Sequence, residues 1–111
     1  MRHDPEKLRT DVRLAIEEVE RLFRGKTFED FIADRGLQLI AERELEIIGE
    51  ALARLRRDHP ETADHVADLD KIIGLRNVLA HGYDSLDCEI LWDVLENKLE
   101  ALQSDIKKIN L

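Results

Sequence analysis

The segment DPEKLRTDVRLAIEEVERLFRG, residues 4–25, indicates the fold class of this chain. Asp4 and Pro5 form a typical helix start, because an N-cap acceptor is followed by proline at the first helical position. Gly25 is expected to end the helix. Apolar residues recur between these ends at spacings of three and four, which predicts one buried helix face: Leu8, Val12, Ala15, Ile16, Val19, Leu22 and Phe23.

A short second helix is expected directly after the first. Thr27 and Asp30 fit a capping box, in which each side chain accepts a hydrogen bond from the other residue's backbone. Gly36 is expected to separate this short helix from the next one. The phenylalanines of the chain fall close together in this region and are expected to pack at one corner of the core: Phe23, Phe28 and Phe31.

Three more long helices are expected in the rest of the chain. The first covers residues 37–57 and ends before Pro60, because the residue before a proline avoids the helical region. The second is expected to begin at Asp64 as its N-cap and to break at Gly82. The third is expected to begin at Asp87 and to continue for about 22 residues.

These elements predict an all-α fold with four longer helices and one short helix. Short connections make sequential helices antiparallel neighbours, so the expected architecture is an up-and-down helical bundle. Residues 1–111 are expected to form a single helical domain. Helices this long in a small protein present more apolar surface than one core can use, which favours a homodimer.

Composition excludes several functional classes. Hydrophobic residues make up 43% and charged residues 38% of the chain, and its 17 basic and 25 acidic side chains give a net charge of −8. This acidity argues against a dedicated non-specific nucleic-acid binder but permits an enzyme with a small local basic patch. Apolar runs are too short to span a bilayer, so no membrane association is expected. The single cysteine, Cys88, is expected to be structural and favours a cytoplasmic location.

Most polar residues give no sign of catalysis. No histidine stands at helical spacing from the glutamates in the long helices, so no metal site and no cofactor are expected. Glu46 and Glu50 lie within an apolar run and are expected to be partly exposed. The glutamates as a group are expected to face solvent: Glu17, Glu18, Glu20, Glu42, Glu44, Glu46 and Glu50.

One stretch differs from the rest, namely LRNVLAHGY at residues 75–83. At 100° per residue, Arg76, Asn77 and His81 fall on one side of a helix, and Leu75 and Leu79 fall on the other. A purely structural interpretation is a helix end, with His81 at the negative end of the helix dipole and Tyr83 closing the core. The alternative is a group of side chains that acts on a ligand.

The segment RNVLAHGY resembles the signature of the HepT-like toxins of the HEPN (higher eukaryote and prokaryote nucleotide-binding) superfamily. In that signature an arginine is followed by four residues, a histidine, one residue and a tyrosine. The resemblance covers the whole chain: it includes the DP start, TFEDF, LEIIGEAL, HPE, GLRN, HGY and ILW. It implies an all-α bundle that forms a homodimer, with the motif helices of both subunits lining one cleft. Ala80 departs from the family, where a bulkier aliphatic residue often precedes the histidine; this affects packing rather than chemistry.

The resemblance also implies a function. Members of the family are metal-independent endoribonucleases that act as toxins, and their partner is a nucleotidyltransferase antitoxin that adds AMP to the motif tyrosine. Carried over to this chain, Arg76 and His81 are the catalytic pair and Tyr83 is the modification site. Asn77 is a supporting polar residue, and the substrate is an RNA such as a tRNA or an mRNA. Two copies of Arg76 in a dimer cleft would offset the overall acidity locally.

Two other functions remain open from the sequence. One is a non-catalytic HEPN dimer that binds nucleotide or RNA and docks a partner protein. It needs Arg76, whereas only the ribonuclease needs His81 to take up and release a proton near neutral pH. The other is a plain helical interaction protein in which the motif has no chemical role.

Overall fold

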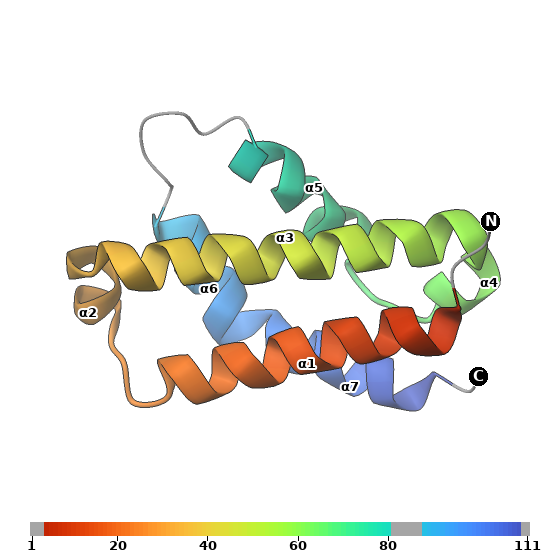
Figure 1. Cartoon of the computed structure of the whole chain (residues 1–111), viewed down its shortest axis with the longest axis horizontal. Helices are drawn as coiled ribbons and strands as arrows, with labels where there is room; N and C mark the ends of the chain where they lie inside the picture. The colour runs from red at the N-terminus through yellow and green to blue at the C-terminus, as the bar shows by residue number, and fades with distance from the viewer. Residues whose placement is uncertain (1–3, 81–87, 110–111) are drawn as a thin grey trace.

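The computed structural model describes residues 4–80 and 88–109, with side chains up to residue 75 and from residue 88 onward. Within these ranges the chain is all-α, as expected, and contains seven helices and no strand (Figure 1). None of the described helices is both long and apolar enough to cross a membrane. The helices are α1 (Pro5–Phe23), α2 (Phe28–Ala33), α3 (Arg35–Asp58), α4 (Pro60–Ala63), α5 (Leu69–Ala80), α6 (Cys88–Asn97) and α7 (Leu99–Lys108).

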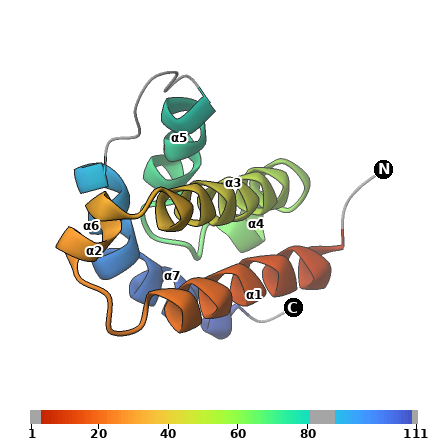
Figure 2. The same ribbon diagram turned by 60° about the vertical axis from the view of Figure 1, so that its left-hand side comes forward.

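Two long antiparallel helices, α1 and α3, form the frame of the molecule (Figure 1). The C-terminal pair closes the core against them, because α6 packs on α2 and α3 while α7 packs on α1. Helix α5 packs on α3 and leans away from the layer of α1 and α3 (Figure 2). The antiparallel arrangement is therefore present, but α5 does not lie flush in a regular four-helix bundle.

The helix ends that depend on local capping are where the sequence predicts them. The Asp4 side chain accepts a hydrogen bond from the Glu6 backbone N–H at 2.9 Å. Gly25, with a φ of 77°, follows the end of α1. The reciprocal capping box of α2 is also confirmed, with Thr27 and Asp30 joined at 2.9 and 3.1 Å. Donation from the Thr27 backbone N–H, together with the Thr27 side chain, lowers the pKa of the Asp30 carboxyl.

The boundary between α2 and α3 differs from the expectation at Gly36. Asp34, not Gly36, separates these helices, and Gly36 lies in the first turn of α3. The Asp34 side chain accepts from the Leu37 backbone N–H at 3.2 Å, while its own backbone N–H donates to Phe31. One residue thus ends α2 and caps α3, which makes a glycine break unnecessary.

The expected helix from Asp64 to Gly82 begins later than predicted. Asp64 ends the short helix α4 instead of capping a long one, and α5 starts at Leu69. Asp68 has a φ of 57°, a left-handed conformation that interrupts a helix. The backbone N–H of Ala67 donates to Asp105 Oδ2 of α7 at 3.0 Å, so this turn is held by a contact that is remote in sequence.

The expected last helix is two helices. Lys98, with φ of −110° and ψ of −32°, separates α6 from α7. The helical hydrogen bonds continue through this break. The Lys98 N–H donates to the Val94 carbonyl, and the Leu102 N–H donates to the Lys98 carbonyl. The bend allows α6 to pack on α2 while α7 packs on α1.

The core contains most of the residues that the helical spacing predicts, although Leu22 of the first helix is only half-buried. Glu44, expected to face solvent, is buried with 7% of its surface exposed, beside Glu18 of α1. Burial raises the pKa of the Glu44 carboxyl, and the charge of Glu18 and a hydrogen bond with it add to the shift. The largest fully buried side chains of the core are Val12, Ile16, Phe31, Leu45, Ile48, Leu52, Leu55, Leu91, Leu99, Leu102 and Ile106.

The expected aromatic corner is present and has a fourth member. Phe23 and Phe31 lie 5.9 Å apart between ring centroids, as predicted. Trp92 of α6 connects the corner, because its ring lies 5.4 Å from Phe31 and 6.1 Å from Phe28. Cys88, the first residue of α6, packs against the core as a free thiol, in keeping with the structural role expected for it.

Candidate functional site

The motif of residues 76–83 begins inside α5. Arg76 and Asn77 lie in the helical backbone of α5, which extends to Ala80. The predicted catalytic His81 and the predicted modification site Tyr83 lie outside the described residues. The structure therefore places the arginine end of the motif on the C-terminal half of α5.

The N-terminal half of α5 is held firmly on α3. Ile72 and Ile73 are buried in the core, and Leu75 is half-buried against it. An ion pair between Arg56 of α3 and Asp70 of α5 adds a polar contact at the surface. Because apolar burial dominates the free energy of packing, these isoleucines fix where the motif-bearing end of the helix points.

The C-terminal half of α5 extends beyond this anchored part. The apolar pattern of α5 continues past Leu75 in the sequence with Val78 and Leu79. Among the described residues, α3 is the only helix that packs extensively on α5, and Figure 2 shows α5 standing away from α1. Apolar helix faces are normally covered, so an apolar stripe that continues to the end of α5 suits a further contact.

Charges near the start of α5 are paired. Besides the ion pair of Arg56, Lys71 lies 3.7 Å from Asp68. These cations are therefore partly neutralised by carboxylates of the same region, and Arg76 is the next basic residue along the chain.

Histidines in the described chain lie at helix ends or in turns. His59 ends α3, and His65 is exposed in the turn after α4. In residues 4–80 and 88–109, no three His, Cys, Asp or Glu side chains are grouped closely enough to hold a metal ion.

Sequence reasoning missed two residues outside the motif that the structure brings into notable positions. Trp92 lies at the centre of the aromatic corner, and Glu44 is a buried acid. A signal for Trp92 was available, because it is the single tryptophan and falls at the border of the apolar face of α6. Nothing in the sequence around Glu44 predicts its burial, because that burial depends on where α1 lies.

The chain combines an all-α fold with an Arg-x4-His-x-Tyr motif that begins in α5. The family model described as Ribonuclease HepT-like matches residues 12–109. The chain belongs to this HepT-like ribonuclease family of the HEPN superfamily, as its motif indicates.

Curated relatives agree with this assignment. A protein of Thermococcus cleftensis named "Probable ribonuclease HepT" is 32% identical over 103 residues, which cover 89% of this chain and 89% of the relative. A provisionally named RNase of Caldanaerobacter subterraneus subsp. tengcongensis is 34% identical over 91 residues, covering 82% of this chain and 80% of the relative. No solved structure matches the chain significantly.

Proposed function

We propose that this chain is a metal-independent endoribonuclease that cleaves RNA with Arg76 and His81. One observation carries the proposal: the run Arg-x4-His-x-Tyr starts near the C-terminal end of α5 in a chain of the HepT-like ribonuclease family. The names of the Thermococcus and Caldanaerobacter relatives support RNA as the substrate class.

The chemistry needs no metal, because RNA carries its own nucleophile. The ribose 2′-oxygen attacks the adjacent phosphorus, the bond to the 5′-oxygen breaks, and the products carry a 2′,3′-cyclic phosphate and a 5′-hydroxyl. His81 removes the 2′-hydroxyl proton when neutral or protonates the leaving oxygen when charged, since its ordinary pKa is about 6.5. Arg76 binds the phosphate through two N–H donors and neutralises the charge that develops on it. Asn77 supports this polar face, and Tyr83 donates to a non-bridging oxygen or stacks on a base.

The active form in this proposal is a homodimer in which two α5 helices line one cleft. The apolar end of α5 that leans away from the α1 and α3 layer supports such a contact. Two copies of Arg76 would then offset the net charge of −8 where RNA binds.

The proposed biological role is that of a cytoplasmic toxin. Its partner would be a nucleotidyltransferase antitoxin that adds AMP to Tyr83 and so places a bulky anion beside Arg76 and His81. The added phosphate would occupy the position of the RNA phosphate and repel the substrate backbone.

The decisive experiment compares RNA cleavage by the wild type and His81→Ala in EDTA. We expect the wild type to cleave and the variant to lose at least about a hundredfold in rate, because general acid–base catalysis contributes that much. His65→Ala is the matched control, since His65 is exposed in the turn after α4 and lies outside the motif. Full activity of His81→Ala would exclude His81 from the mechanism. A folded, RNA-binding but inactive wild type would instead favour the non-catalytic binding module.

The role of Tyr83 is tested by co-expression with the nucleotidyltransferase followed by peptide mass spectrometry. We expect one AMP on Tyr83, loss of RNA binding and an unchanged helical spectrum. Tyr83→Phe should resist neutralisation by AMP transfer, provided that its residual cleavage is measured first, because the hydroxyl also takes part in substrate binding. AMP on another residue would contradict the assignment.

A further inference from the structure

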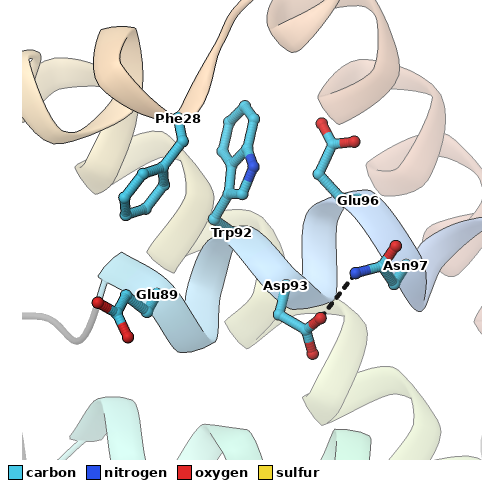
Figure 3. Close-up of a pocket in the computed structure, with 6 residues that line it drawn as sticks. All are labelled: Phe28, Glu89, Trp92, Asp93, Glu96 and Asn97. Carbon is cyan, nitrogen blue, oxygen red and sulfur yellow. Dashed lines mark hydrogen bonds between the residues drawn. The ribbon is translucent and has the colours of Figure 1, made fainter.

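A cavity of about 400 Å³ lies on the side of the molecule formed by α2 and α6. Figure 3 shows the side chains that line it, with the Trp92 indole standing between Phe28 and Glu96. None of the described lining residues comes from α5. Its lining residues are Phe28, Glu89, Trp92, Asp93, Glu96 and Asn97.

The aromatic walls of the cavity are fixed by the fold. The rings of Phe28 and Trp92 lie 6.1 Å apart and are tilted by 58°. Trp92 also rests on Phe31, which is completely buried, at 5.4 Å. Phe28 directly follows Thr27, the N-cap residue of α2, so the capping box determines the position of Phe28. The two rings therefore form a rigid apolar wall that is only partly covered.

The remainder of the lining is acidic. Glu89, Asp93 and Glu96 contribute three carboxylates, and none of the described lining residues is basic. Asn97 Nδ2 donates to Asp93 Oδ1 at 2.7 Å, which orients that carboxylate (Figure 3). Residues 81–87, which precede α6, contain no lysine or arginine and add two aspartates to the sequence.

The described lining of the cavity includes no lysine or arginine of its own. Arg24 lines a neighbouring cavity of about 170 Å³ on another side of Trp92, and the described ion pairs include none between Arg24 and Glu96. A coordinated metal ion does not fit, because the described carboxylates are not grouped closely enough to hold one. A planar cation with an apolar stem fits both the rings and the carboxylates.

We infer that this cavity is a docking site for an arginine side chain presented by a partner protein. A guanidinium group stacks on an aromatic face and donates to carboxylates in the same plane, whereas a lysine ammonium does only the second. An RNA backbone is unsuited to the cavity, since three carboxylates would repel it.

The test uses Trp92, the single tryptophan of the chain, as a reporter. Indole fluorescence and the indole N–H resonance of the full-length protein are followed while N-acetyl-arginine amide is added. Its citrulline analogue, which has the same shape but no charge, and N-acetyl-lysine amide are titrated in parallel. We expect saturable binding of the arginine probe in the millimolar range, weaker binding of the lysine probe and none of the citrulline probe.

Matched charge variants locate the binding. Glu96→Gln should weaken binding of the arginine probe roughly two- to fivefold, the effect of losing one partly exposed charge pair. Glu100→Gln removes the same charge from an exposed position on α7 that does not line the cavity, and it should bind like the wild type. RNA cleavage should be unchanged in both variants, so a failure of this proposal is distinguishable from a failure of the proposed ribonuclease.

Other outcomes would overturn the inference. Equal binding of the citrulline probe would show an apolar pocket without charge recognition. A response to Mg²⁺ or spermidine without a response to the arginine probe would show a non-specific cation site. A Trp92 signal that changes with protein concentration but not with the probes would show that a second copy of the chain covers the cavity.

Discussion

Glu44 is the residue whose environment departs most from its chemistry. It lies on α3 with 7% of its surface exposed and shares a hydrogen bond with Glu18 of α1. Burial raises its pKa above the ordinary value of 4.5, and the neighbouring charge of Glu18 adds to this. The folded protein therefore binds a proton at Glu44 more tightly than the unfolded chain does, and this contribution to stability is lost as the pH rises through the raised pKa.

We predict that Glu44→Gln raises the free energy of unfolding at pH 7 by on the order of 1 kcal/mol. Glutamine keeps a donor for Glu18 but carries no charge to desolvate. Urea denaturation should show the gain shrinking as the pH falls, until it disappears below the ordinary pKa, where the wild-type carboxyl is protonated in both states. Glu100→Gln, at an exposed position on α7, should show no such trend. A constant gain at all pH values would contradict a titrating Glu44.

At the scale of elements, two glycines that differ in backbone conformation test how that conformation affects helix stability. Gly25 has a φ of 77° after α1, and a Cβ there would meet no atom within 4 Å. Gly74 lies inside α5, and a Cβ there would also meet nothing within 4 Å. Neither substitution creates a clash, so the backbone conformation alone separates their effects.

Gly25→Ala should destabilise the protein by about 1 kcal/mol, because alanine pays a steric cost at positive φ. Gly74→Ala should stabilise it by roughly 0.5–1 kcal/mol through helix propensity. Thermal unfolding should give shifts of opposite sign, on the order of 4 °C each. The same sign for both would show that packing, not backbone conformation, governs one of the two sites. Loss of dimer in Gly74→Ala would identify that packing as intersubunit.

At the scale of the whole molecule, an acidic protein that acts on RNA must concentrate its few cations. Helix α5 packs extensively on α3 alone among the described helices and carries Arg76 toward its C-terminal end. Pairing two such helices would bury their apolar sides and bring two arginines to one groove.

We therefore predict a symmetric dimer, with twice the 12.9 kDa mass of the chain, in sedimentation at micromolar concentration. In a Cys88→Ser background, Asn77→Cys should form a disulfide between subunits under mild oxidation, because Asn77 of α5 lies on the polar face that lines the predicted cleft between the two subunits. Glu100→Cys, on α7, should not cross-link. A monomer, or cross-linking at position 100 alone, would place the interface elsewhere.

The sequence by itself determined the helical class, the caps at Asp4 and Thr27, the end of α1 at Gly25 and the break before Pro60. Each of these depends on hydrogen bonds or dihedral preferences within a few residues, so local chemistry is sufficient. The family motif was also visible in the sequence, and the family match confirms that resemblance, whereas the roles of Arg76, His81 and Tyr83 stay predictions.

Only the tertiary structure decided the features that depend on distant contacts. The start of α5 at Leu69 follows a turn held by Asp105, which lies 38 residues from Ala67 in the chain. The bend at Lys98 accompanies the packing of Trp92 on Phe31 and of α7 on α1. Glu44 is buried because α1 covers it, and local spacing carries no record of that neighbour. Free energies of packing between remote segments settle such positions, and a single helix cannot encode them alone.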